Sequence, residues 1–272
     1  MINIVLQMLS YRFIVNALVV GALVALCAAL LGVSLVLKRY SMIGDGLSHV
    51  GFGALAIATA MNAAPLTVAI PVVVLAAFLL LRISESSSIR GDAAIALIST
   101  TALAAGVIAV SVSGVNTDVY SYMFGSILDM SDSDVKQGVL LSAAVLIMFV
   151  LFYNKIFAVT FDESFSRASG VKTNIYNMVI AILTALTIVL GMRVMGTLLI
   201  ASLIIFPALT SMRLCKTFKA VVICSATVSL FCFFAGVTAS YIYSLPTGAS
   251  VVAVNAVMFM LFSITAFIKR IF

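Results

Sequence analysis

Long runs of hydrophobic residues, separated by short polar segments, dominate this chain. Nine such runs can be delimited: 13–37, 44–61, 64–82, 92–111, 136–153, 174–192, 195–214, 218–242 and 248–270. A helix that crosses a membrane needs about 20 apolar residues, within a range of about 17–25. The pattern predicts an all-α, polytopic membrane bundle of eight or nine transmembrane helices. Eight is the alternative count because the run 44–61 is short and polar at its start, and 195–214 contains Pro207.

Composition excludes an ordinary soluble domain. Of the 272 residues, 64% are hydrophobic and only 9% are charged, whereas soluble domains carry about 25% charged residues. Too few polar residues remain to build a separate aqueous domain, so we expect one transmembrane domain over residues 1–272. The first run is longer than the apolar segment of a secretory signal peptide, and we expect it to remain as a membrane helix.

The basic residues predict the orientation. With nine spans and the N-terminus outside, 12 of the 15 lysines and arginines fall on the inner side, and only Arg12, Lys136 and Arg193 fall outside. The positive-inside rule therefore favours an outer N-terminus and an inner C-terminus. The net charge of +6 is explained by this topology, and we expect a lipid bilayer and no nucleic acid as its partner.

One ionisable pair stands at the head of an apolar run. Asp45 and His49, the only histidine, are four residues apart in SMIGDGLSHVGFGALAIA, residues 41–58. Positions i and i+4 share a helix face, and ionisable residues within membrane spans usually face a pathway or a partner. An imidazole nitrogen and a carboxylate oxygen form half of a divalent-metal site. The simpler alternative is a helix cap at Asp45 and one interhelical hydrogen bond at His49.

The longest polar inner segment is 154–173, NKIFAVTFDESFSRASGVKT. Asp162 and Glu163 precede Arg167 and Gly170, and acid at the start, base near the end and glycine beyond predict a short helix. The segment is either a solvated connector or a docking helix for a cytoplasmic partner.

Pro207 lies inside the run 195–214, where proline removes a backbone hydrogen bond and kinks or breaks a helix. The hydroxyls of Ser202, Thr210 and Ser211 are candidates to bond the freed backbone groups. The kink is either an ordinary feature of a membrane helix or a point that bends during gating.

Motifs of enzymes are missing from the chain. The single histidine excludes HExxH, and neither a P-loop nor a GxSxG serine motif occurs. We expect a transporter or channel subunit rather than an enzyme.

Five segments resemble, in order, the membrane permease of metal-ion ABC importers, the zinc and manganese uptake family. They are LGVSLVLKRYSMIGDGLSHVGFG at 31–53, YSYMFGSILDMSDSDV at 120–135, FDESFSRASGVKT at 161–173, MGTLLIASLIIFPALTS at 195–211 and LPTGASVV at 245–252. The segment 161–173 departs from the family pattern, because Ser164, Phe165 and Ser166 follow the acids where the family often has alanine.

The resemblance implies a homodimer in a prokaryotic cell membrane, served by two cytoplasmic ATPase subunits and an extracytoplasmic metal-binding protein. It implies that Asp45 and His49 line the translocation path, and that Asp162, Glu163 and Gly170 couple the permease to the ATPase. No permanently bound cofactor is implied, and Zn²⁺ or Mn²⁺ is the transported substrate.

The choice of metal rests on one short segment of the sequence. SYMFGSIL at 121–128 is more similar to zinc permeases than to manganese permeases, in which asparagine often replaces the equivalent of Ser126. We therefore expect zinc first and manganese second. The remaining alternative is an ion-gradient-coupled secondary metal transporter, in which Asp45 and His49 carry protons.

Overall fold

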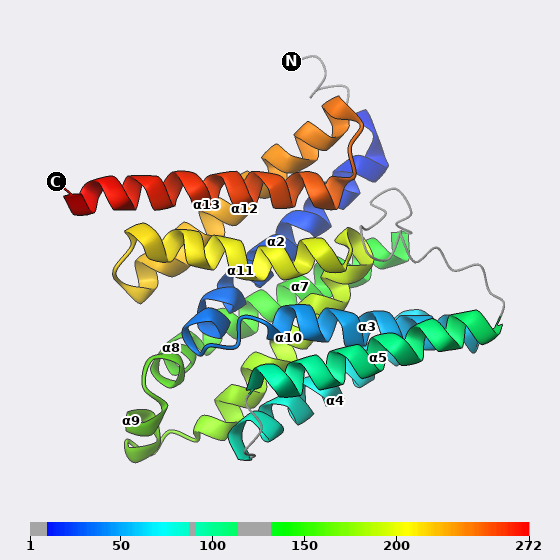
Figure 1. The fold of residues 1–272 in the computed structure, drawn as a ribbon, viewed down its shortest axis with the longest axis horizontal. Helices are drawn as coiled ribbons and strands as arrows, with labels where there is room; N and C mark the ends of the chain where they lie inside the picture. Colours follow the sequence, from blue (N-terminus) through cyan, green and yellow to red (C-terminus); the bar gives the residue numbers. More distant parts are fainter. Residues whose placement is uncertain (1–9, 87–90, 114–131, 272) are drawn as a thin grey trace.

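The computed structural model describes residues 10–86, 91–113 and 132–271, and all regular structure within them is helical (Figure 1). In chain order the helices are α2 (Arg12–Leu37), α3 (Ile43–Ala60), α4 (Pro65–Ser86), α5 (Gly91–Ser113), α7 (Asp132–Leu151), α8 (Tyr153–Phe161), α9 (Glu163–Ala168), α10 (Thr173–Met195), α11 (Thr197–Leu214), α12 (Phe218–Tyr243) and α13 (Thr247–Ile271).

The all-α prediction is confirmed, and each hydrophobic run corresponds to one long helix. The polar segment 154–173 contains the two short helices α8 and α9. The count of eight or nine membrane spans is not established by these helices. Five of those described, α2, α5, α10, α12 and α13, are long and apolar enough to cross a membrane. A sixth is added if α7 and α8, bent by 69° at their junction, form one span.

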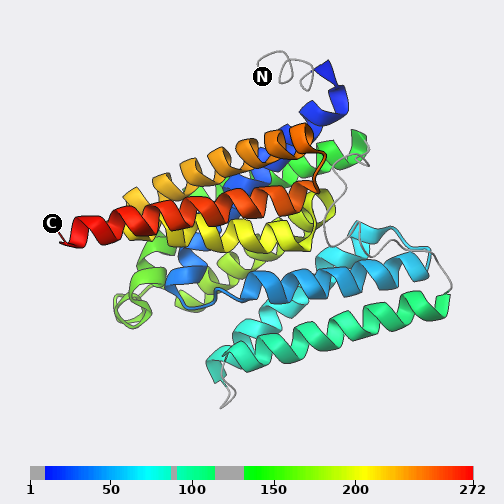
Figure 2. The same ribbon diagram turned by 45° about the horizontal axis from the view of Figure 1, so that its top comes forward.

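The helices form two neighbouring groups (Figures 1 and 2). Helix α3 packs most extensively against α5 and also against α4, while α2 contacts α7, α10, α11 and α12. Helices α10 and α11 both contact α3, and α10 also packs along α4, which joins the groups. Much of α2 and α10 is buried, whereas α5 and α13 expose most of their apolar side chains. These exposed faces are available to lipid or to another protein.

Close backbone approach explains the tight pairing of α3 with α5. A Cβ added at Gly53 would lie 2.3 Å from the carbonyl oxygen of Ala102, and one added at Gly106 would lie 2.7 Å from Cα of Gly53. Small residues let membrane helices approach until their backbones touch. The two glycines thus hold α5 against the helix that carries Asp45 and His49.

Helix α11 continues through Pro207 to Leu214. The three candidate hydroxyls do not bond the carbonyl that proline leaves free, that of Leu203 four residues earlier. Ser202 donates to the Leu199 carbonyl oxygen at 2.8 Å and Ser211 to that of Pro207 at 2.7 Å. The Thr210 hydroxyl has no hydrogen-bond partner within the described part of the chain.

Candidate functional site

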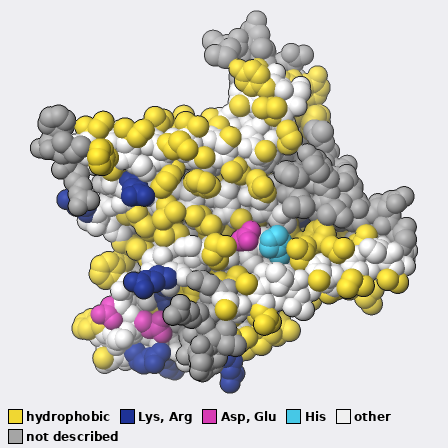
Figure 3. All heavy atoms as spheres, in the orientation of Figure 1, with side chains coloured by type: hydrophobic (Ala, Val, Ile, Leu, Met, Phe, Trp, Pro, Cys, Tyr) yellow, Lys and Arg dark blue, Asp and Glu magenta, His cyan; other side chains and the backbone are white. Residues whose placement is uncertain are grey.

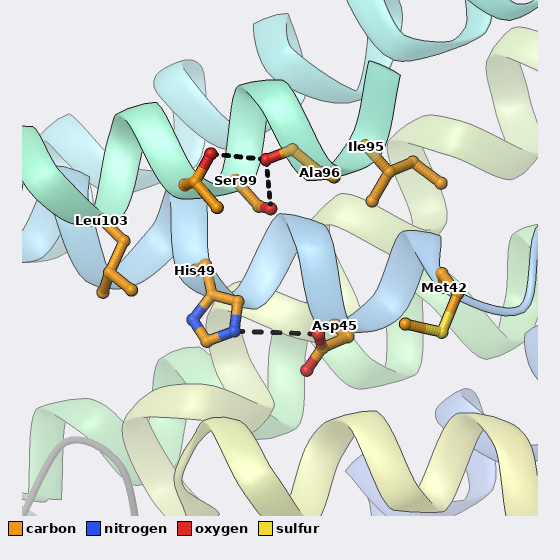
Figure 4. A pocket seen from close by; sticks show the side chains of 8 residues that line it. Met42, Asp45, His49, Ile95, Ala96, Ser99 and Leu103 are labelled. Atoms are coloured by element: carbon orange, nitrogen blue, oxygen red, sulfur yellow. Dashed lines mark hydrogen bonds and ion pairs between the residues drawn. The ribbon is translucent and has the colours of Figure 1, made fainter. Parts of the chain in front are cut away.

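Asp45 and His49 lie on one face of α3, as their spacing predicts (Figure 4). Asp45 Oδ2 is 3.7 Å from His49 Nε2, and 45% of the aspartate and 29% of the histidine side chain are exposed. Asp45 is in the first turn of α3, where a carboxylate is favoured by the partial positive charge of the helix N-terminus. The backbone N–H groups of this turn are not capped by the side chain of Met42, the N-cap residue.

The pair borders a recess of about 280 Å³ between α3 and α5. Asp45, His49 and Met42 line one side, and Ser99, Thr100 and hydrophobic residues of α5 line the other. Figure 3 shows the chain's single histidine beside an acidic side chain at the surface, with mainly apolar and uncharged atoms around them. The two side chains are neither fully buried nor part of a highly charged surface.

The separation of the two side chains suits one cation. Two ligand atoms that are each about 2.1 Å from the same ion can be at most about 4.2 Å apart. The observed 3.7 Å lies within that limit, so one ion could contact both groups without a change of backbone. Borderline divalent cations accept this combination of imidazole nitrogen and carboxylate oxygen.

Two protein ligands form an incomplete site. Among the residues that the structure describes, no group of three or more histidine, cysteine, aspartate or glutamate side chains could hold a metal ion. A structural zinc centre needs four ligands. The pair alone fits transient contact with a passing ion better than permanent binding, because an ion that is held too well does not leave.

The second candidate region is the short helix α9, whose predicted limits are confirmed. The Asp162 carboxylate accepts a hydrogen bond from the Phe165 N–H at 2.8 Å, which caps the N-terminus. At the other end Gly170 has φ = 81°, and Val171 N–H donates to the Ser166 carbonyl, the pattern of a Schellman motif. Phe165 projects from this helix with 70% of its surface exposed.

Glu163 joins α9 to two long helices. Lys38 Nζ, at the end of α2, donates to Glu163 Oε2 at 3.0 Å and to Asn177 Oδ1 of α10 at 2.6 Å. Asn177 Nδ2 in turn donates to Glu163 Oε1 at 3.2 Å, as does an Arg167 guanidinium nitrogen at the same distance. The Lys38 side chain is only 9% exposed, so its charge is paired where water has little access.

This environment changes the acidity of Glu163. Partial burial of the carboxyl acts to raise its pKa, but hydrogen bonds from Lys38 and Asn177, together with the charges of Lys38 and Arg167, lower the pKa below its ordinary value of 4.5. Glu163 is therefore ionised at neutral pH and holds α9 through charge-assisted bonds.

The structure places the predicted site residues in three separate places. Asp45 and His49 lie together in the recess, whereas Asp162, Glu163 and Gly170 lie on and beside α9, and Pro207 lies within α11. Ser126 and most of the segment 120–135 lie outside the described residues.

Sequence reasoning missed Lys38, Asn177 and Ser99 as members of these sites. In the sequence, Lys38 is only one of the basic residues assigned to the inner side, and nothing local marks it as buried. Ser99 and Thr100 were visible as polar interruptions of an apolar run, but their hydroxyls bond the Ala96 carbonyl of their own helix. Only the pairing of α3 with α5 brings them beside His49.

A bundle of apolar helices, an ionisable pair that borders an open recess and a short polar helix at one end are the features expected of a membrane permease. The sequence model of the ABC 3 transport family matches residues 10–266. The chain belongs to this family, whose members are multi-pass permeases of ABC transporters, and its place is the plasma membrane.

Relatives with known names support the same class. The "Manganese import system permease protein ScaB" of Streptococcus gordonii is 28% identical over 92% of this chain and 90% of its own length. The "Probable metal transport system membrane protein" of Thermotoga maritima is 34% identical over 93% of this chain and 90% of its own. A solved structure, "PsaBC from Streptococcus pneumoniae in complex with Fab", superposes with a TM-score of 0.86 at 28% identity, over 96% of this chain and 95% of that one.

The resemblance read from the sequence is thus confirmed at the level of a metal ABC transporter permease. The expectation of zinc gains no specific support, because manganese is the metal in the names of several relatives. That expectation rested on a segment around Ser126, outside the described residues.

Proposed function

We propose that this chain is the membrane-spanning half of an ATP-driven importer that moves a divalent transition-metal ion into the cytoplasm. The observation that carries the proposal is the Asp45–His49 pair, 3.7 Å apart on α3 and open to a recess. An ionisable pair is costly in an apolar bundle, and it is retained where it faces a path for ions. The family membership supports the use of ATP by a separate subunit.

The proposed passage of the ion follows from the incompleteness of the pair. An extracytoplasmic metal-binding protein delivers the ion to the outer face, and the ion is held briefly by Asp45 and His49. The exposed apolar face of α5 suits a second copy of the permease, so that two pairs can approach one path. Alternating access requires two arrangements of the helices, and Pro207 is the proposed point of bending in α11.

The proposed contact with the cytoplasmic ATPase is α9. Its ends are fixed by the Asp162 cap and by Gly170, and Glu163 ties it to the bundle. Exposed Phe165 offers an apolar side chain of the size that anchors protein interfaces. Because both ends of α9 are fixed, a movement of the ATPase subunit would displace the whole helix and would not unwind its ends.

For the substrate we propose manganese or zinc, to be separated by direct competition. The sequence around Ser126 favours zinc, while the names of relatives favour manganese. An aspartate and a histidine serve either ion, so the pair itself does not choose between them.

The test is metal uptake into liposomes that contain the purified permease with its ATPase subunits, with the metal-loaded binding protein supplied at the outer face. We expect His49→Ala to lower Mn²⁺ or Zn²⁺ uptake by more than about 100-fold, because even changes around metal ligands cost about 10–100-fold. ATPase subunits should remain bound. Thr59→Val is the matched control, since Thr59 lies on the same helix and bonds only the Leu55 carbonyl. Normal uptake by His49→Ala at limiting metal would refute the site.

The alternative, an ion-gradient-coupled transporter, is tested in the same liposomes. It requires uptake that follows a proton or sodium gradient and continues when ATP is withheld. The proposed importer requires that uptake depend on ATP hydrolysis by the ATPase subunits and not on an ion gradient.

A further inference from the structure

The Lys38–Glu163–Asn177 cluster joins α9 to the end of α2, the helix that precedes α3 in the chain. Lys38 is the C-cap residue of α2, Glu163 begins α9, and Asn177 lies near the start of α10. All three bonds of the cluster are between side chains of different helices, at 2.6, 3.0 and 3.2 Å. Within the described bundle it is the direct side-chain link between α9 and the end of α2.

The segment that follows Lys38 leads directly to the ion pair. Only residues 38–42 separate α2 from α3, and Asp45 is in the first turn of α3. This connection is tightly bonded: Tyr40 N–H donates to the Leu35 carbonyl at 2.8 Å, and Ile43 N–H donates to the Tyr40 carbonyl at 3.0 Å. A displacement of Lys38 therefore cannot be absorbed by slack in the chain.

Backbone strain marks the same connection. Arg39 has φ = 63°, and its N–H donates to the Val36 carbonyl, so it occupies the position in a Schellman motif that glycine usually fills. A residue with a side chain pays a conformational cost there. Such strained residues persist where surrounding bonds hold them, and the bonds of Lys38 to Glu163 and Asn177 begin one residue earlier.

We propose that Lys38 is a positioning residue that transmits movement of α9 to the start of α3, and so to Asp45 and His49. The inference rests on the proposed function. When the ATPase pushes α9, the Glu163 carboxylate pulls the Lys38 ammonium with it, and the rigid 38–42 connection turns the first turn of α3. Asn177 holds the ammonium against α10, which gives the movement a fixed reference.

The charges around Lys38 explain why this link would be stronger than a surface ion pair. The Lys38 side chain is 9% exposed, and its ammonium has one carboxylate and one amide oxygen as partners. Lys38 is the shielded member of the pair, and leaving a mostly buried charge without its partner costs more than breaking a fully exposed pair. The Lys38–Glu163 bond should therefore transmit a force that would break an exposed, solvent-screened ion pair.

The experiment measures metal ions moved per ATP hydrolysed, in the full complex in liposomes, with Mn²⁺ and Zn²⁺ as probes. Lys38→Met keeps the length of the side chain and removes its charge. We expect metal moved per ATP to fall about tenfold, within the range of measured coupling between sites, while the ATPase subunits stay bound and still hydrolyse ATP. Lys219→Met is the control, because Lys219 is an exposed lysine at the start of α12, and its ratio should not change.

A role limited to stability predicts a different result. Lys38→Met would then lower the melting temperature and the amount of complex, with an unchanged ratio of metal to ATP in the complexes that remain, and that unchanged ratio would overturn the inference. If Lys38→Met fails to assemble, Lys38→Glu is compared with the double variant Lys38→Glu/Glu163→Lys. Recovery of the ratio in the double variant supports the link, and equal loss in both overturns it.

Failure of the proposed function has a separate signature. A wild-type complex that hydrolyses ATP without moving metal would overturn the importer and the inference together. A wild-type complex that moves metal, with His49→Ala inactive and Lys38→Met at the wild-type ratio, would overturn the inference alone.

Discussion

At the residue scale, the Glu163 carboxylate joins three helices while part of it stays open to solvent. Its two oxygens accept bonds from Lys38, Asn177 and Arg167, so that one side chain joins α2, α9 and α10. About a third of that side chain is still exposed. The bonds are strong enough to keep the carboxylate ionised, and its exposed part lets it respond to the pH of the surrounding solution.

The lowered pKa of Glu163 gives a prediction on stability. A carboxyl whose folded pKa lies below its unfolded value stabilises the protein above the unfolded value, here 4.5, and loses that contribution as pH falls through the folded pKa. Wild type should melt above Glu163→Gln at pH 7, by about 1–3 °C because solvent screens a partly exposed pair. The gap should close below pH 4.5, measured by thermal unfolding in detergent across pH.

The difference between the two proteins isolates Glu163 from the other acids, which protonate in both. A gap that widens as the solution becomes acidic would contradict the assigned direction of the pKa shift. A gap that is absent at every pH would show that the bonds to Lys38 and Asn177 contribute no net stability.

At the scale of elements, the α3–α5 pair decides the geometry of the recess. The two backbones meet at Gly53 and Gly106, and the recess lies nearer the start of α3, between His49 and Ser99. A change that pushes the helices apart at the glycines should therefore alter the recess without touching its lining.

Gly53→Ala should lower the free energy of unfolding by about 1–3 kcal/mol, the usual cost of overpacking. Its new Cβ would lie 2.3 Å from a backbone oxygen, which cannot turn aside. Gly44→Ala, on the same helix, is the control, because its Cβ would lie 3.0 Å from the terminal methyl of the flexible Ile204 side chain. Thermal unfolding of the two variants in detergent should separate them, and equal melting temperatures would contradict the close approach.

At the scale of the whole molecule, helix length and the hydrophobic pattern give different numbers of membrane crossings. The lengths and hydropathy of the described helices alone support five or six, while the nine hydrophobic runs and the basic residues favour nine with an outer N-terminus. Helices that are buried among others, such as α3 and α11, can cross a membrane with fewer apolar residues than a helix that faces lipid.

Single cysteines in a cysteine-free background test this topology. Nine crossings place Met61 and Tyr243 outside and Phe165 and Lys219 inside, so a membrane-impermeant maleimide added to intact cells should label only the first two. If α11 did not cross, Tyr243→Cys would be protected in intact cells and labelled only after permeabilisation. Met61 and Tyr243 are exposed in the structure, and so are Phe165 and Lys219, so burial would not explain a missing label.

The sequence by itself determined the all-helical class, the limits of most long helices, the start and end of α9, and the shared face of Asp45 and His49. These properties depend on local periodicity, composition and capping, which a linear pattern records. The hydroxyls near Pro207 were expected to bond freed backbone groups, but Ser202 and Ser211 bond carbonyls of their own helical turns, and Thr210 has no partner among the described residues.

Only the tertiary structure decided that Lys38 joins Glu163 and Asn177, residues far from it in the chain. Only the structure, too, placed Ser99 in one recess with His49, because two glycines let α3 and α5 touch. A side chain's burial and partners follow from which helices pack together, and in an apolar chain nearly every helix offers the same hydrophobic surface. Hydrophobicity therefore selects the elements, and the close fit of small residues and the pairing of rare charges select their arrangement.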